Sequence, residues 1–448
     1  MQGYLPGYEL DPTTWVYVSS LLTIGVFFKF HRLWSVRNLD LAGLILLAPG
    51  LLWVARGQGP GGYIWLFTVG SFFLVRLLLD PLMVRRPLLE PNLNASGLTF
   101  TGVALMVFLM SNVVTGRLYP LAKQPIAGGP EARDSAHPLL YSVADLSRNA
   151  APADDGGIQP KQVRPSARAR TAMVRTLAVL AHLAMVIGIA LIGYRHFDNV
   201  HTGVAMASLY LVLPYTAQMA ARVDHVVPAA LLVWAIAAYR RPALAGIAIG
   251  LAAGLIGYPL FLVPLWTGFY WRRGLIRFAV GVVSGLVLLV FLLLIFMLVL
   301  RLFGLTDVGS FGDRLADLFG WTRLPLPKAD GFWQEHGQPL RIPVIAAFCV
   351  LSGSLALWPA QKNLGTLLSC SAAVMLGVQF WHPYHGGVYM AWYLPLLVLT
   401  IFRPNLEDRV AVTAVSESRT PWQTAGGFPW RVDAGTARRK ESRGSFNK

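Results

Sequence analysis

The sequence predicts an all-α fold, a polytopic bundle of about 11–13 transmembrane helices. Of its 448 residues, 55% are hydrophobic and only 13% are charged, whereas about 25% are charged in an ordinary soluble domain. Apolar runs of about 20 residues, the length that crosses a hydrocarbon core of about 30 Å, recur from Thr13 almost to Phe402. Lipid is therefore expected to be the main solvent of the chain.

The apolar segments divide the chain into two membrane regions. The first region, 1–112, contains four predicted helices, and the second, 173–402, contains the others. The predicted helices span roughly 13–30, 40–55, 62–79, 96–112, 173–193, 202–221, 226–239, 243–256, 258–270, 275–300, 341–358, 364–380 and 387–402.

The remaining segments are more polar. We expect 113–172 to be a flexible outer loop, because it is rich in Pro, Ala, Gly and Ser and has no strong hydrophobic periodicity. A second outer loop is expected at 301–340. The segment 403–448 has no long apolar run, and it is expected to be a disordered, basic cytoplasmic tail near anionic lipid.

Short basic clusters between the helices predict the orientation, because cytoplasmic loops are enriched in Lys and Arg. The clusters contain Lys29, Arg32, Arg37, Arg76, Arg85, Arg86, Arg240, Arg241, Arg272, Arg273, Arg277 and Lys362. All of them can lie inside only if 243–270 is a hairpin of two short helices that turns at 256–259, where Gly257 and Pro259 favour a break. The N-terminus is then outside and the C-terminus inside.

The net charge of +16 has a membrane explanation. The basic residues lie between apolar runs and in the tail, so we expect them to contact lipid headgroups and predict no nucleic-acid partner. Cys349 and Cys370 both lie within apolar runs, which favours neither a disulfide framework nor a zinc site. No cofactor and no metal are predicted.

The outer connection between the helices at 202–221 and 226–239 carries three ionisable residues, Arg222, Asp224 and His225. Arg222 could orient an anionic substrate, and Asp224 or His225 could accept a proton. The alternative is a connection that is polar only because it is exposed to water.

Further polar residues fall on the predicted outer side. Glu335 and His336 lie in the second outer loop, and His382 and His385 lie in a turn before the last helix. Histidines three residues apart could ligate a metal, but Pro383 makes this segment a turn. Hydrogen bonding to a sugar or lipid headgroup is the preferred interpretation, and a belt of interfacial aromatic residues is the alternative.

Two more residues could carry chemistry. Asp134, in the first outer loop, could act as a base if the loop packed back on the bundle, and a solvated acid is the alternative. His182 lies within an apolar run, where an ionisable group is costly and often functional. A hydrogen bond from a neutral His182 to a neighbouring helix explains it equally well.

Three segments resemble the central core of GT-C superfamily glycosyltransferases, especially the bacterial enzymes that use polyprenol-phosphate-mannose. They are LYLVLPYTAQMAARVDH at 209–225, LLVWAIAAYRR at 231–241 and AGIAIGLAAGLIGYPLFLVP at 245–264. In that family a helix ends in a polar outer turn, a second helix returns to a basic loop, and an Ala-Gly-rich hairpin follows. The hairpin tip differs, because the family often has Lys where this chain has Ile256 and Gly257 before Tyr258.

The resemblance implies a GT-C-like core at 173–402 and a hexosyl or mannosyl transferase that takes a sugar from a polyprenol-phosphate donor at the outer leaflet. It implies that Asp224 or Asp134 is the general base, aided by His225, and that Arg222 holds the donor phosphate. Tyr258, the outer-loop residues Glu335 and His336, and the turn residues His382 and His385 would contact substrate. The family's early acidic motif is missing, so a non-catalytic protein or a transporter is the alternative.

A wider similarity concerns the segments at 5–12, 27–40 and 402–409. They resemble uncharacterised membrane proteins of planctomycete-type bacteria. This resemblance implies a bacterial inner membrane and no particular activity.

Overall fold

The computed structural model describes residues 12–57, 59–83, 89–115, 165–302, 331–336, 338–406 and 409–417. This part of the chain is a bundle of α-helices with no β-strand, which confirms the predicted all-α class. Within it, six helical segments are long and apolar enough to cross a membrane: 36–55, 61–82, 95–114, 174–196, 275–292 and 364–381. The chain is a multi-pass membrane protein.

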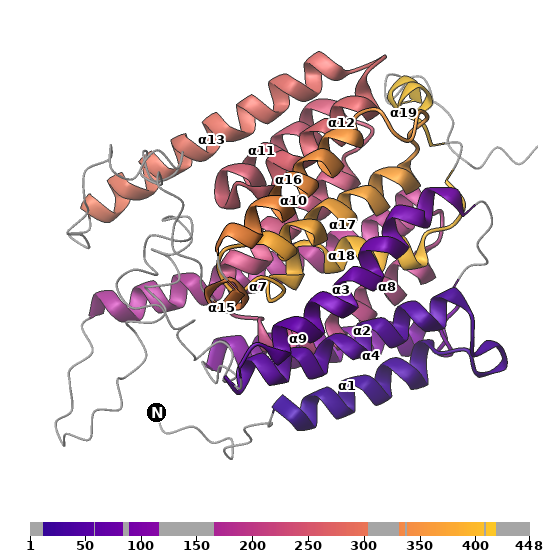
Figure 1. Cartoon of the computed structure of the whole chain (residues 1–448). Helices are drawn as coiled ribbons and strands as arrows, with labels where there is room; N and C mark the ends of the chain where they lie inside the picture. The colour runs from indigo at the N-terminus through magenta and orange to yellow at the C-terminus, as the bar shows by residue number, and fades with distance from the viewer. Residues whose placement is uncertain are drawn as a thin grey trace, which may run out of the picture.

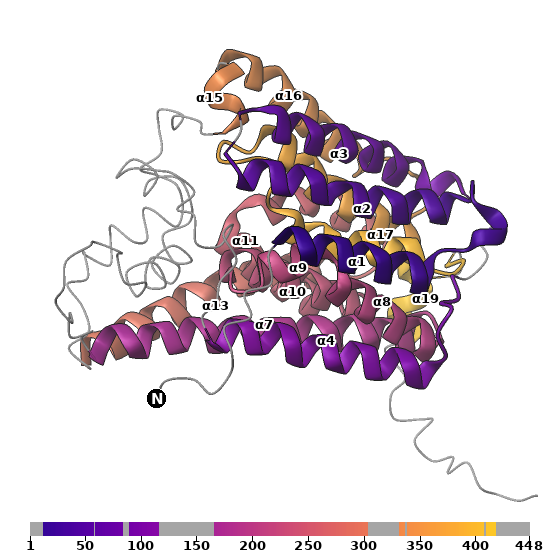
Figure 2. The same ribbon diagram turned by 90° about the horizontal axis from the view of Figure 1, so that it is seen from below.

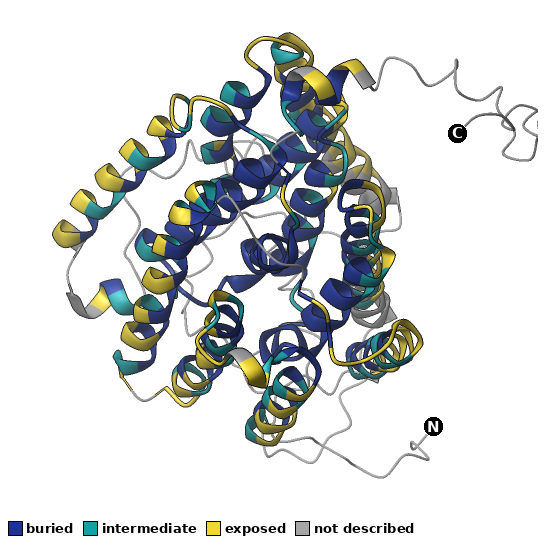
Figure 3. Cartoon of the chain, turned by 90° about the vertical axis from the view of Figure 1, so that its right-hand side faces the viewer, coloured by how far each residue is buried: buried dark blue, intermediate teal, exposed yellow. Residues whose placement is uncertain are grey.

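The burial pattern agrees with a lipid environment. Viewed along the bundle, buried residues face the interior and exposed residues lie on the outward faces (Figure 3). Many of the exposed residues are large and apolar, including Val107 of α4 and Val287 of α13. In water such faces would favour aggregation, whereas lipid tails solvate them.

The first four helices are α1 (Pro12–Phe27), α2 (Val36–Ala55), α3 (Gly61–Leu79) and α4 (Ala95–Thr115), close to the predicted positions. Helices α2 and α3 run side by side (Figures 1 and 2). The next helix, α7 (Pro165–His196), begins before the predicted boundary at 173, so part of the predicted outer loop is helical.

The predicted helix at 202–221 is broken. It forms α8 (Val200–Val212) and the short α9 (Pro214–Gln218), because Pro214 has no N–H to continue the hydrogen-bond ladder. Helix α10 (Val223–Ala237) follows after a short connection. The break turns the chain just before the polar residues that the sequence singles out.

The hairpin required by the charge pattern is present. It consists of α11 (Pro242–Ile256), the 3-10 segment η4 (Tyr258–Leu262) and α12 (Val263–Tyr270). Gly257, at the turn, has a φ of 75°, which a residue with a side chain rarely adopts. The Tyr270 hydroxyl donates to the Tyr239 carbonyl oxygen, so the chain returns to the end of the bundle from which it left.

Helix α13 (Leu275–Leu302) packs on α11 through glycines. A methyl group at Gly250 would overlap the Val282 carbonyl oxygen, and one at Gly281 would overlap that of Ala243. The two backbones are therefore in direct contact, as in membrane helix pairs with small residues at every fourth position. The opposite face of α13 points away from the bundle (Figure 1).

The C-terminal part surrounds the most buried membrane helix, α17 (Leu364–Trp381). It also contains α15 (Phe332–His336), α16 (Gln338–Ser354), η5 (Met390–Trp392) and α18 (Leu394–Phe402). The predicted helix at 387–402 is thus shorter than expected.

The predicted disordered tail is partly ordered, which corrects the expectation for its first residues. Helix α19 (Ala411–Glu417) buries Ala414 and Val415 against the bundle, and Arg409 forms an ion pair of 3.1 Å with Asp198. Four apolar residues in a short stretch are too few to predict a packed helix from the sequence. Residues 418–448 lie outside the described part of the chain.

A buried ion network marks the end of the bundle where the described basic clusters gather, which we call the inner end after the predicted orientation. Arg76 pairs with Asp40 (3.1 Å) and Asp80 (2.9 Å), and Arg403 pairs with Asp80. All four side chains are less than one-tenth exposed. The network joins α2 and α3 to the end of α18, so it links the first membrane region to the C-terminal part of the bundle.

Candidate functional site

Several parts of the chain that are far apart in the sequence meet at the opposite end of the bundle, which we call the outer end after the predicted orientation. They are the start of α10, the hairpin tip, the start of α16, the turn after α17, and η5. We call the residues that they contribute the outer cluster: Tyr215, Arg222, Asp224, His225, Tyr258, Arg341, His382, Tyr389 and Trp392.

Arg222 and Asp224 form a two-pronged ion pair at the start of α10. Arg222 donates from Nε to Oδ1 (3.0 Å) and from Nη2 to Oδ2 (2.7 Å) of Asp224. Asp224 lies in the first turn of the helix, where the dipole favours a negative charge. The residue is only 6% exposed, so the arginine compensates a carboxylate that has lost most of its water.

His225 lies next to this ion pair and is buried within the bundle. The Tyr215 hydroxyl forms a hydrogen bond with its Nδ1, and its Nε2 lies 3.6 Å from Oδ2 of Asp224. If Nδ1 accepts from the phenol, the ring proton is on Nε2 and points at the carboxylate. At 3.6 Å the imidazole lies beside the carboxylate without a hydrogen bond to it, while the phenol holds its other ring nitrogen.

Aromatic rings join this group to the rest of the cluster. Tyr389 stacks on His225 (ring centroids 4.6 Å apart) and on Trp392 (4.6 Å), and it also contacts His382 (4.5 Å). The Trp392 indole donates to the Asp224 carbonyl oxygen (3.3 Å). Tyr258, at the hairpin tip, contacts both Trp392 and His382.

The turn after α17 is held by Gln379. Its side-chain oxygen accepts from the backbone N–H groups of Gly387 and Tyr389, both at 3.2 Å. His382 donates from Nδ1 to the Tyr384 carbonyl oxygen (2.7 Å). Burial lowers the pKa of His382 to about 3, an effect that the hydrogen bond to Tyr384 only partly offsets. His382 is therefore neutral at pH 7.

The other outer residues predicted from the sequence are placed differently. His385 lies in the same turn but hydrogen-bonds the Tyr63 hydroxyl of α3, away from His382. Glu335 and His336 belong to α15, which packs against α16, and their side chains lie outside the described residues. Asp134 lies outside them altogether. No group of three potential metal ligands occurs in the described part.

Arg341 is a member of the cluster that the sequence reasoning did not single out. It lies in the first turns of α16, is 5% exposed, and donates from Nε to the Trp381 carbonyl oxygen (2.8 Å). A signal was present, because an arginine at the outer start of a helix runs against the positive-inside rule. Tyr215 and Gln379 gave no such signal, since both lie within apolar runs.

His182 has a structural explanation. Its Nε2 lies 3.1 Å from the Ala220 carbonyl oxygen, and its Nδ1 lies 3.0 Å from the Tyr210 hydroxyl. Both ring nitrogens are therefore satisfied by neighbouring helices, which is the second of the two interpretations of this residue.

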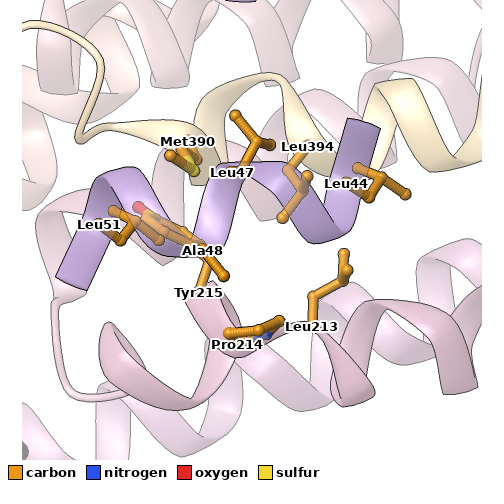
Figure 4. Close-up of a pocket in the computed structure, with 9 residues that line it drawn as sticks. All are labelled: Leu44, Leu47, Ala48, Leu51, Leu213, Pro214, Tyr215, Met390 and Leu394. Atoms are coloured by element: carbon orange, nitrogen blue, oxygen red, sulfur yellow. The ribbon is translucent and has the colours of Figure 1, made fainter. Parts of the chain in front are cut away.

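A small apolar cavity lies beside the cluster (Figure 4). It is bounded by leucines of α2, such as Leu47, by Pro214 and Tyr215 at the α8–α9 break, and by Met390. Its free volume of about 10 Å³ is about that of one water molecule. Tyr215 lies between this cavity and His225.

Chemically, the outer cluster combines a carboxylate held by arginine, a neutral imidazole beside it, and the partly buried ring of Tyr258, which can stack on a sugar ring. Comparison of the chain with models of known protein families, with curated protein sequences and with solved structures finds no match.

Proposed function

We propose that the protein is a membrane glycosyltransferase that transfers a sugar from a polyprenol-phosphate donor at the outer leaflet of a bacterial inner membrane. The observation that carries the proposal is the meeting of Arg222, Asp224 and His225 with Tyr258 and His382 in one cluster. If the connection before α10 were polar only because it is exposed to water, these residues would point apart into solvent or lipid. The likeness of 209–264 to GT-C enzymes supports the same conclusion.

Each residue has a role in this reaction. An acceptor hydroxyl attacks the anomeric carbon of the sugar, its proton passes to Asp224, and the polyprenyl phosphate leaves. Arg222 holds the carboxylate in position through two hydrogen bonds. His225 stands within 3.6 Å of Asp224 and can share the proton. The Tyr258 ring, which is only partly buried, provides a face for the sugar.

The test uses the full chain in proteoliposomes with a polyprenol-phosphate hexose that carries a radiolabelled sugar. We expect transfer of the label to an acceptor or, without one, its slow release by water. Wild-type protein that turns over no such donor would count against an enzyme.

Asp224→Asn should reduce this turnover by about a hundredfold or more, since a positioned general base contributes about 10²–10⁴-fold. The measurement is the initial rate of label transfer. Asp198→Asn is the matched control, because Asp198 is an exposed aspartate that also pairs with an arginine but lies at the inner end. Equal rates for the two variants would remove Asp224 from the mechanism.

A transporter is the second candidate, and one observation favours it. Gln218, at the end of the broken helix, is 1% exposed, and neither atom of its amide has a hydrogen-bond partner in the described residues. Transporters place polar groups at discontinuous helices to bind substrate. Uptake of a sugar or lipid-linked sugar into vesicles without chemical change would favour transport over transfer.

A further inference from the structure

The charges of the outer cluster do not balance within the described residues. Arg222 is neutralised by Asp224, and His382 is neutral at pH 7. Arg341 adds a positive charge, and no carboxylate in the described part of the chain pairs with it. A buried cation without an anion costs several kcal/mol, so the site is suited to a negative ligand.

The other buried arginines show how unusual this is. Arg76 lies against two aspartates, and Arg403 lies against one. Both are buried to about the same extent as Arg341, with 8% and 6% of their surface exposed against 5%. Among the arginines that the structure describes as buried, Arg341 is the one whose charge no acidic side chain compensates.

The unused hydrogen-bonding capacity of Arg341 lies in the two terminal nitrogens of its guanidinium group. Nε is engaged by the Trp381 carbonyl oxygen, which fixes the guanidinium at the end of α17. The two terminal nitrogens have no hydrogen-bond partner in the described residues, and neither is fully enclosed. A planar pair of N–H donors in this state matches two oxygens of a phosphate.

The residues around Arg341 indicate that such a phosphate belongs to a membrane lipid. The neighbours of Arg341 in the sequence, Leu340 and Ile342, are 63% and 58% exposed on the outward face of the bundle, where lipid lies. On the inner side, Tyr258 and Tyr384 are close enough to interact electrostatically with the guanidinium. Arg341 is thus placed between lipid and the outer cluster.

We infer that Arg341 is a binding site for the phosphate of a membrane lipid, seated between α16 and the end of α17. Its two terminal nitrogens hold two phosphate oxygens, while the lipid chains lie along the exposed face of α16. The inference does not depend on glycosyl transfer, because a phosphate monoester or diester would bind here whether or not a sugar is attached.

The experiment measures binding of farnesyl phosphate, farnesol and inorganic phosphate to the full chain in detergent by native mass spectrometry and by ligand-induced thermal stabilisation. We expect farnesyl phosphate to bind wild type and to bind Arg341→Gln at least about tenfold more weakly, the loss of one charge-assisted hydrogen bond. Farnesol, which lacks the phosphate, should not distinguish the two proteins. Arg272→Gln, an exposed arginine at the inner end, is the matched charge control and should bind like wild type.

Other outcomes decide the matter as well. Arg341→Lys keeps the charge but loses the paired N–H donors of the guanidinium, so it should bind farnesyl phosphate with intermediate affinity. If Arg341→Gln does not fold, the comparison of wild type with Arg341→Lys is the test. Equal affinity of wild type and Arg341→Lys or Arg341→Gln overturns the inference. Saturation of the site by inorganic phosphate at the same concentrations as by farnesyl phosphate overturns the lipid source. If farnesyl phosphate binds but no sugar is transferred from a polyprenol-phosphate donor, the proposed enzymatic activity is contradicted and the inferred phosphate site is not.

Discussion

Replacing Asp80 by Asn should destabilise the folded bundle by about 3–5 kcal/mol, which is the loss expected when one partner of a buried ion pair is removed. Asp80 is fully buried and compensates both Arg76 and Arg403. Without its charge, Arg76 keeps the carboxylate of Asp40, and the carboxylate that pairs with Arg403 is lost. The measurement is equilibrium unfolding of the purified protein in SDS.

A matched control separates this effect from a general loss of surface charge. Asp198→Asn removes another aspartate that pairs with an arginine, but Asp198 is 73% exposed, and exposed pairs contribute about 0–1 kcal/mol. The double variant Asp80→Asn with Arg403→Met should recover part of the loss, because it removes the cation that is left uncompensated. A stability of Asp80→Asn equal to that of Asp198→Asn would show that the network does not hold the inner end together.

Gly250→Ala should also destabilise the protein, by about 1–3 kcal/mol, as expected when a close-packed contact is overfilled. The added methyl group meets the Val282 carbonyl oxygen, which is backbone and cannot rotate away. Helices α11 and α13 must therefore move apart. We expect a lower unfolding temperature in detergent and faster proteolysis of the chain at α13.

Gly353→Ala is the control for this prediction. Gly353 is also within an apolar helix, α16, but no atom lies within 4 Å of the position that its methyl group would occupy. There the same change should stabilise the helix by about 0.5–1 kcal/mol, since alanine loses less backbone entropy than glycine. If both variants behave alike, the α11–α13 contact is not the tight backbone packing described above.

The helical bundle and the hairpin could be predicted because their signals are local. Apolar runs directly predict membrane-spanning helices. The basic residues on both sides of 243–270 place both ends of this segment on the same side of the membrane, which requires the chain to reverse within it. The α8–α9 break was missed because 202–221 is a continuous apolar run of the right length for one helix. Pro214 was its signal, and in a membrane segment proline is common enough to be discounted.

The candidate site could be predicted only in part. Arg222, Asp224 and His225 attract notice because three ionisable residues crowd a short connection. Their partners do not, since the Tyr215 phenol and the Trp392 indole look like ordinary apolar core in the sequence. Which side chains meet across the bundle depends on the packing of distant segments, and the local pattern does not encode it.

The short core helices have a consequence for the surrounding bilayer. Helices α10 and α11 have 15 residues each, which corresponds to a length of about 22 Å, against a hydrocarbon thickness of about 30 Å. On that flank the two leaflets must pinch together, or the outer cluster must lie below the level of the headgroups. In the first case, the vertical distance between a lipid phosphate and Arg341 is shortened, so the protein itself would bring the proposed ligand closer to its site.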